Sequence, residues 1–118
     1  MFYTSYGYIL IASNIYNIKS FKEDNEQAFK AIVDFQNDDP QGNASMSFEY
    51  DTNGRILIPF TFFGETAEQR NQIFTKAFNV IKKFFPSCKT LLKIDLKNDN
   101  NKEFFNDKVY DYLNEEVF

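Results

Sequence analysis

The chain of 118 residues has a net charge of −4, 43% hydrophobic residues and 25% charged residues, which predicts a single folded domain over residues 1–118. This acidity argues against non-specific nucleic-acid binding, which depends on clustered Lys and Arg side chains. The absence of His removes the commonest general base and metal ligand, and the single cysteine, Cys88, excludes an internal disulfide and a Cys-rich metal site.

The first predicted elements are a strand over residues 2–12, rich in Tyr and Ile, and a helix that starts near Ser20. Ser20 and Glu23 match a capping box, in which each side chain bonds the backbone amide of the other residue. The sequence Asp-Asp-Pro at residues 38–40 closes this helix. Its apolar stripe has helical spacing and consists of Ala28, Phe29, Ile32 and Val33.

Residues 44–51 alternate in polarity and predict a strand, and the apolar run after Gly54 predicts its hairpin partner. A two-residue loop, Asn53-Gly54, would set acidic side chains on the same face as the apolar run. A three-residue loop with left-handed Gly54 instead pairs Asp51 with Arg55. In that register Tyr50, Phe48 and Met46 lie opposite Ile56, Ile58 and Phe60, respectively. Because a one-residue slip exchanges the two faces, the apolar pattern favours the three-residue loop.

The second half of the chain predicts a helix, a strand and another helix. Thr66 and Gln69 form a capping box at the start of a helix that Pro86 ends. The strand around residues 89–97 alternates apolar with charged side chains. The terminal helix, over residues 98–118, has one apolar side, made of Phe105, Val109, Tyr112 or Leu113, and Val117.

This order of elements predicts an α+β fold, a four-stranded antiparallel sheet with two helices on one face. The β-α-β-β-α-β order is that of ferredoxin-like domains, here with an added C-terminal helix. Pro59 conflicts with this topology, because proline cannot donate to a strand ladder and the third strand is central. Either the ladder is broken at Pro59, or the hairpin lies at the edge of a meander.

Acidic side chains are concentrated near the end of the chain. Between residues 98 and 118, six acidic residues accompany only Lys102 and Lys108, a local charge of −4. A carboxylate stripe, one residue in every four, consists of Glu103, Asp107, Asp111 and Glu115. Such a stripe is either a solvated outer face or a docking surface for a basic partner, on which repulsion between the carboxylates is relieved.

Three other candidate sites in the sequence each have a simpler structural explanation. The sheet face away from the helices would carry Leu57, Thr61 and Phe63, with either Tyr6 and Tyr8 or Tyr3 and Ile9, a distant analogue of an RNA-stacking platform. The simpler expectation is that the terminal helix covers this face with Phe105, Val109 and Leu113. A carboxylate-based hydrolase or metal site could use Asp38, Asp39, Glu49 and Asp51. The Cys88 thiol lies next to Lys89 but has no His partner, which favours a half-buried structural cysteine.

We therefore expect a non-enzymatic protein-binding inhibitor without cofactor or metal. Its most concrete form is an immunity-type protein, an antitoxin that neutralises a basic, nuclease-like toxin in a bacterial cell. The expected contacts are the stripe residues, with Asp38 and Asp39 as a weaker addition. The alternatives are a phage-type acidic antagonist of a host nucleic-acid-binding defence enzyme and a homodimeric structural domain. Residues 1–12 lack the features of a signal peptide, and no segment reaches the about 20 apolar residues of a membrane span, so we expect a cytoplasmic protein.

Overall fold

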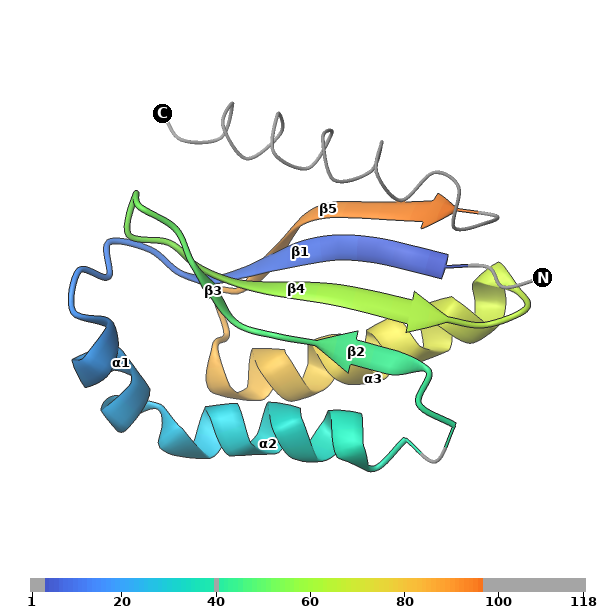
Figure 1. Ribbon diagram of the computed structural model, residues 1–118, viewed down its shortest axis with the longest axis horizontal. Coiled ribbons are helices and arrows are strands. Elements are labelled where there is room, and N and C mark those ends of the chain that lie inside the picture. Colours follow the sequence, from blue (N-terminus) through green and yellow to red (C-terminus); the bar gives the residue numbers. More distant parts are fainter. Residues whose placement is uncertain (1–3, 40, 97–118) are drawn as a thin grey trace.

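Strands and helices are described for residues 4–39 and 41–96 of the computed structural model (Figure 1). In chain order they are β1 (Thr4–Ala12), α1 (Ile18–Asp24), α2 (Glu26–Asn37), β2 (Ala44–Met46), β3 (Glu49–Tyr50), β4 (Ile56–Phe63), α3 (Ala67–Phe84) and β5 (Lys89–Leu96). The five strands of this part of the chain form one antiparallel sheet in the order β2-β4-β1-β5, and β3 also pairs with β4. The α+β class predicted from the sequence is confirmed. The predicted terminal helix over residues 98–118 lies outside the described residues.

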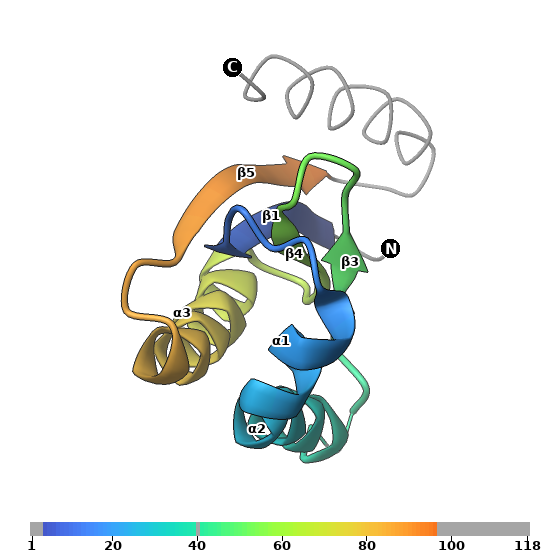
Figure 2. The same cartoon turned by 90° about the vertical axis from the view of Figure 1, so that its left-hand side faces the viewer.

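All three described helices lie on one face of the sheet, as the end-on view shows (Figure 2). The main core fills the space between these layers. It is formed by strand residues that alternate along β1 and β4 and by residues of α2 and α3, and its fully buried members include Ile9, Ile58, Phe62, Ala77 and Ile81. This alternation follows from the strand geometry, in which successive side chains point to opposite faces.

The first predicted helix is in fact two helices, and its predicted start is wrong. Asn17 caps α1, and its Oδ1 accepts a hydrogen bond from the Ser20 amide at 3.0 Å, so Ser20 is not the cap. Asn25 separates α1 from α2. Val33 of the predicted stripe is 48% exposed, whereas Phe35 packs against the core. In contrast, the capping box of Thr66 and Gln69 at the start of α3 is confirmed.

The hairpin between β3 and β4 has the predicted three-residue loop. Gly54 is left-handed with φ of +80°, and the Asp51 amide donates to the Arg55 carbonyl at 3.0 Å. Tyr50 pairs with Ile56, and Met46 of β2 pairs with Phe60, in one continuous register. Ile56, Ile58 and Phe60 are all buried. The hydrophobic pattern therefore selected the correct register, as expected when only one register buries the apolar set.

Pro59 explains why the predicted second strand is divided into β2 and β3. β4 is a central strand, flanked by β1 on one side and by β2 and β3 on the other. The Ser47 amide donates to the Pro59 carbonyl at 3.1 Å, but the Pro59 nitrogen has no hydrogen to return the bond. The ladder is interrupted at this pair, and the edge strand is split there while the pairing of Pro59 with Tyr8 of β1 continues. The alternative meander is wrong, because β4 pairs with β1 and lies between β1 and the edge strand formed by β2 and β3.

Two left-handed glycines provide a matched test of the hairpin. A Cβ on Gly54 would lie 3.0 Å from the Tyr16 ring, whereas a Cβ on Gly42, with φ of +65°, would meet nothing within 4 Å. We expect Gly42→Ala to cost about 1 kcal/mol through backbone strain alone, and Gly54→Ala to cost about 2–3 kcal/mol because the contact adds to that strain. Urea denaturation of both variants measures the difference. Equal losses would show that Tyr16 moves aside without cost.

Within residues 4–39 and 41–96, no helix combines the length and the hydropathy needed to cross a membrane.

Candidate functional site

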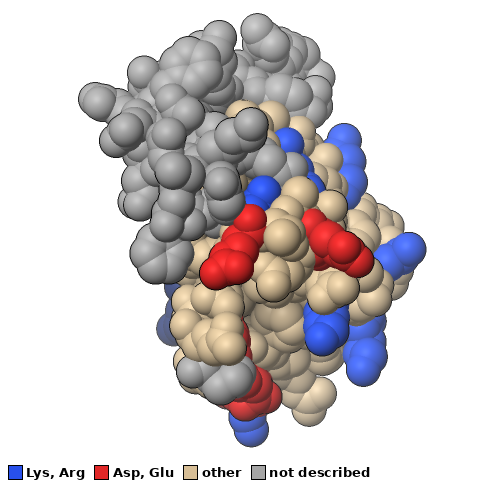
Figure 3. Space-filling view, turned by 90° about the vertical axis from the view of Figure 1, so that its right-hand side faces the viewer, with Lys and Arg blue, Asp and Glu red and all other residues tan. Residues whose placement is uncertain are grey.

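The charge of the chain is unevenly distributed along its length. Because residues 98–118 have a net charge of −4 and the whole chain also has −4, residues 1–97 are neutral overall. The stripe residues Glu103, Asp107, Asp111 and Glu115 lie outside the described residues. On the face displayed in Figure 3, acidic and basic side chains of the described part are interspersed in small groups among uncharged residues. The main predicted contacts, the stripe residues, therefore belong to the same 21 residues of the sequence that carry the net charge.

Asp38 and Asp39, the weaker predicted contacts, lie where α2 ends and have different roles. Asp39 shapes the loop to β2, because its carboxylate accepts hydrogen bonds from the backbone amides of Gln41, at 3.1 Å, and of Asn43. Asp38 is the C-cap residue of α2 and its side chain is exposed. Of the two, Asp38 retains a carboxylate that a basic partner could reach.

A small hollow adjoins these two residues. It has a volume of about 280 Å³ and lies between the end of α2, the start of β2 and the middle of α3, and it is lined by Phe35, Asp38, Asp39, Ala44, Ile73 and Lys76. Lys76 offsets part of the acidic charge at this rim. The structure therefore gives Asp38 and Asp39 a mixed-charge surrounding.

The four carboxylates considered for a hydrolase or metal site are not brought together. Asp38 and Asp39 follow α2, whereas Glu49 and Asp51 flank the β3–β4 turn at the opposite end of the sheet (Figure 1). Nowhere in the described ranges do three or more His, Cys, Asp or Glu residues form a group that could hold a metal ion.

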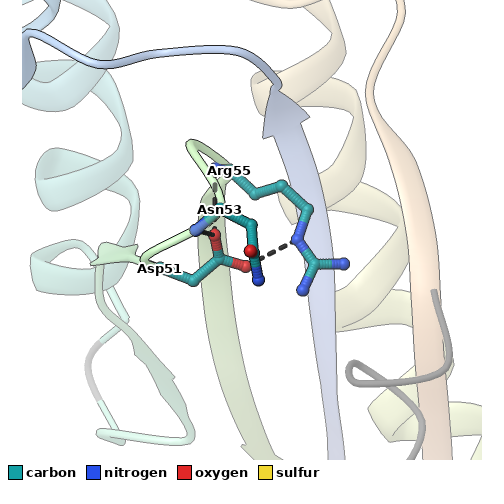
Figure 4. A network of polar contacts seen from close by, with 3 residues as sticks. All are labelled: Asp51, Asn53 and Arg55. Atoms are coloured by element: carbon teal, nitrogen blue, oxygen red, sulfur yellow. Dashed lines mark hydrogen bonds and ion pairs between the residues drawn. The ribbon is translucent and has the colours of Figure 1, made fainter. Parts of the chain in front are cut away.

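The Asp51 carboxylate organises its own hairpin (Figure 4). One oxygen, Oδ1, accepts hydrogen bonds from the Asn53 amide at 2.8 Å and the Arg55 amide at 3.1 Å. The other, Oδ2, forms an ion pair with Arg55 Nε at 2.5 Å. A side chain that bonds the backbone two and four residues ahead is typical of a turn-forming aspartate. Asp51 therefore has a structural role.

The strand register decides which aromatics share the second sheet face, the one away from the helices. Tyr6 pairs with Thr61 and Tyr8 pairs with Pro59, so these two tyrosines share that face with Leu57. Ile9 belongs to the core between the sheet and the helices. This excludes the alternative in which Ile9, together with Tyr3, faces away from the helices. Leu57 is 0% and Tyr6 is 4% exposed, so neither side chain offers an open surface on which a base could stack.

Cys88 follows the end of α3 and is partly buried. Burial raises the pKa of the Cys88 thiol above its ordinary value, and the positive charge of Lys82 opposes this shift only in part. A raised pKa keeps the thiol protonated at neutral pH, and it is the thiolate that reacts. These surroundings support the structural role that the sequence favoured over a reactive one.

One feature of the structure had no signal in the sequence. A cleft of about 620 Å³ separates the α2–β2 loop from the first turns of α3, and its lining is rich in carboxamides: Gln41, Asn43, Phe63, Gly64, Glu65, Gln69, Gln72 and Ile73. Three of these side-chain amides already have partners: Gln69 accepts from the Thr66 amide in the capping box of α3, and the Asn43 side-chain amide donates to that of Gln41. The two walls are more than twenty residues apart in the chain, so no local pattern could have predicted the cleft.

Comparisons with known proteins define the architecture but name no family. No protein-family model and no curated protein matches this sequence. Among solved structures, a de novo designed protein, Foldit4, matches with a TM-score of 0.57 and 11% sequence identity. The match covers 83% of this chain and 99% of the designed chain. At this identity the similarity concerns the fold alone, and it supports the α+β arrangement of helices on one face of a sheet.

Proposed function

We propose that this protein is a binding protein that inhibits a basic partner, most simply an immunity-type protein that neutralises a nuclease-like toxin in the cytoplasm. The observation that carries the proposal is the concentration of the net charge in residues 98–118, next to a domain that is neutral overall. A nuclease surface that attracts phosphate also attracts a carboxylate array, and complementary charge speeds association and selects the partner. Asp38, with its exposed carboxylate, is a secondary contact in this proposal.

The second part of the proposal concerns the fold of the described residues. We infer that the domain is ferredoxin-like, with β2 and β3 as two halves of the second of its four strands. The order of elements along the chain and the strand order β2-β4-β1-β5 support this assignment. Folds of this kind have many functions, so the functional proposal rests on the charge distribution and not on the fold.

Binding assays with a charge-matched control test the proposal. The tagged full chain is used to capture its partner from the source cell, and the affinity and nuclease inhibition are then measured with purified proteins over a range of salt concentrations. Replacement of Asp107, Asp111 and Glu115 by Ser should weaken binding by about threefold to 140-fold, because three exposed charge pairs contribute about 0.2–1 kcal/mol each. The slope of affinity against salt should also decrease.

The control variant removes the same charge from the described domain, by changing the exposed Glu23, Asp24 and Glu65 to Ser. It should bind almost as tightly as the parent protein. If both triple variants weaken binding equally, the attraction is general and the stripe is not the contact surface. A captured partner that is acidic, or whose activity is unaffected by binding, would rule out the inhibitor function itself.

A further inference from the structure

The three-residue loop of the β3–β4 hairpin carries the only Asn-Gly pair of the sequence, Asn53-Gly54. Asn53 is exposed, and its side chain has no hydrogen-bond partner among the residues that the structure describes. An Asn that precedes Gly is especially prone to deamidation, because glycine has no Cβ to hinder its nitrogen as it approaches the Asn side chain. The tip of this hairpin is therefore a candidate site of covalent modification.

In the folded hairpin the backbone nitrogen that would attack is restrained. The Gly54 amide donates to the Asp51 carbonyl at 3.2 Å, and the Gly54 carbonyl accepts from the Ile15 amide at 2.7 Å. Gly54 is buried, and a Cβ placed on it would lie 3.0 Å from the Tyr16 ring. Because peptide groups are planar, these contacts fix the orientation of the peptides on both sides of Gly54. Its nitrogen cannot turn toward the Asn53 side chain unless the bond to Asp51 breaks.

The Asp51 carboxylate holds the same loop closed (Figure 4). Its Oδ1 accepts from the Asn53 amide at 2.8 Å and from the Arg55 amide at 3.1 Å, and its Oδ2 pairs with the Arg55 guanidinium. These bonds hold the residues before and after Gly54 in the turn. Removal of this carboxylate should therefore loosen the loop while the Asn-Gly pair itself is unchanged.

We propose that Asn53 is a deamidation site that the closed hairpin protects, and that the reaction proceeds when the loop opens and releases the Gly54 amide. Loops open locally far more often than a whole domain unfolds. In the open loop the Gly54 nitrogen attacks Cγ of Asn53. The new N–Cγ bond replaces the Cγ–Nδ2 bond, and the proton of the Gly54 amide leaves with the side-chain nitrogen as ammonia. Water then opens the cyclic imide at either of its carbonyl carbons, which gives aspartate or isoaspartate at position 53.

The isoaspartate product does not fit the turn. In isoaspartate the main chain runs through the side-chain methylene, so the backbone path from Asp51 to Arg55 becomes one atom longer. The length of the loop sets the hairpin register, and the bond from the Gly54 amide to the Asp51 carbonyl depends on the same spacing. The modified hairpin is therefore less stable than the original one. This chemistry is independent of the proposed inhibitor function.

Mass spectrometry of the peptide that contains Asn53 measures the reaction in the purified full chain. Incubation at mildly alkaline pH favours the reaction, because the Gly54 nitrogen attacks after it loses its proton. Asp51→Ala should deamidate several-fold faster than the parent protein. The control, Asp34→Ala, removes an exposed carboxylate from α2 and should react at the parental rate. If Asp51→Ala is folded by circular dichroism and reacts no faster than the parent protein, the proposal fails.

Guanidinium chloride provides a measurement that does not require any variant to fold. In the denatured state the parent protein and Asp51→Ala should deamidate at the same rate, and this rate should be many-fold higher than that of the folded parent protein. Equal rates for the folded and the denatured parent protein would overturn the proposed protection. A denatured chain in which Asn53 does not deamidate would overturn the site itself.

A charge-matched comparison tests the effect of the product. The deamidated protein carries an additional negative charge and is separated by ion exchange, and its isoaspartate content is determined. Asn53→Asp carries the same charge on a normal backbone. The isoaspartate form should unfold at a lower denaturant concentration than Asn53→Asp. Identical midpoints would show that the longer backbone fits the turn and would overturn that part of the proposal.

Discussion

Replacement of Gly7 by Val should prevent the domain from folding. Gly7 lies in β1, opposite Phe60 of β4 and Lys93 of β5. A Cβ at this position would lie 2.0 Å from the backbone carbonyl oxygen of Leu92 and 2.4 Å from the Phe60 ring. Real Cβ atoms do not approach a backbone oxygen so closely, and the oxygen belongs to a paired strand that cannot move alone. Even Gly7→Ala should therefore cost about 3 kcal/mol or more, a large part of the about 5–15 kcal/mol that stabilises a typical domain.

Denaturation experiments separate the two clashes. Gly7→Ala is compared with the double variant that also carries Phe60→Leu, which removes the ring but leaves the Leu92 carbonyl in place. The second substitution should restore only part of the lost stability. Full rescue would show that the aromatic ring is the sole obstacle, and a loss of less than about 1 kcal/mol for Gly7→Ala would show that the strands separate easily at this point.

Replacement of Arg70 by Met should destabilise the protein by about 2–4 kcal/mol, because two hydrogen bonds from a charged group are lost in a buried place. Arg70 is only 5% exposed although it lies in the first turns of α3. Its Nε donates to the hydroxyl of the fully buried Ser5 at 2.9 Å, and its Nη1 donates to the Gly64 carbonyl at 2.8 Å. The side chain thus joins α3 to β1 and to the turn after β4.

A double-mutant cycle with Ser5→Ala measures the contribution of one of these bonds. Ser5→Ala alone should cost about 1–2 kcal/mol, and the effects of the two substitutions should be less than additive. Lys76→Met, at an exposed position of the same helix, is the control and should change stability by less than about 0.5 kcal/mol. Additive losses at Ser5 and Arg70 would show that the hydrogen bond between them contributes nothing.

The hairpin register is the part of the fold that local sequence specifies best. A slip of one residue would exchange the faces of Ile56, Ile58 and Phe60, so the burial of these side chains leaves only one acceptable pairing. The capping box at Thr66 was predictable for a similar reason, because all its bonds lie within one helical turn. At the start of the first helix, local patterns competed: Ser20 and Glu23 matched a capping box, but Asn17 forms the cap.

Contacts between segments that are distant in the sequence decided which side chains are buried and which share a sheet face. Arg70 resembles its exposed polar neighbours in the sequence, and only the approach of β1 to the start of α3 buries it against Ser5. The same holds for the choice between Tyr8 and Ile9 on the second sheet face, which depended on how β1 pairs with β4. Sequence periodicity predicts that a strand has two different faces, but it does not predict which of them the helices cover.

The sequence by itself determined that strands and helices have one apolar and one polar face, that the hairpin loop has three residues, and that all net charge lies in residues 98–118. These properties depend on residue type and on spacings of a few positions, where steric and capping rules act directly. Only the tertiary structure decided that β4 is central and that Pro59 divides the edge strand into β2 and β3. It also decided that Asp38 and Asp51, candidates for one carboxylate site, lie at opposite ends of the sheet. Those outcomes depend on pairing between strands far apart in the chain, because such pairing sets which backbone groups and which faces meet.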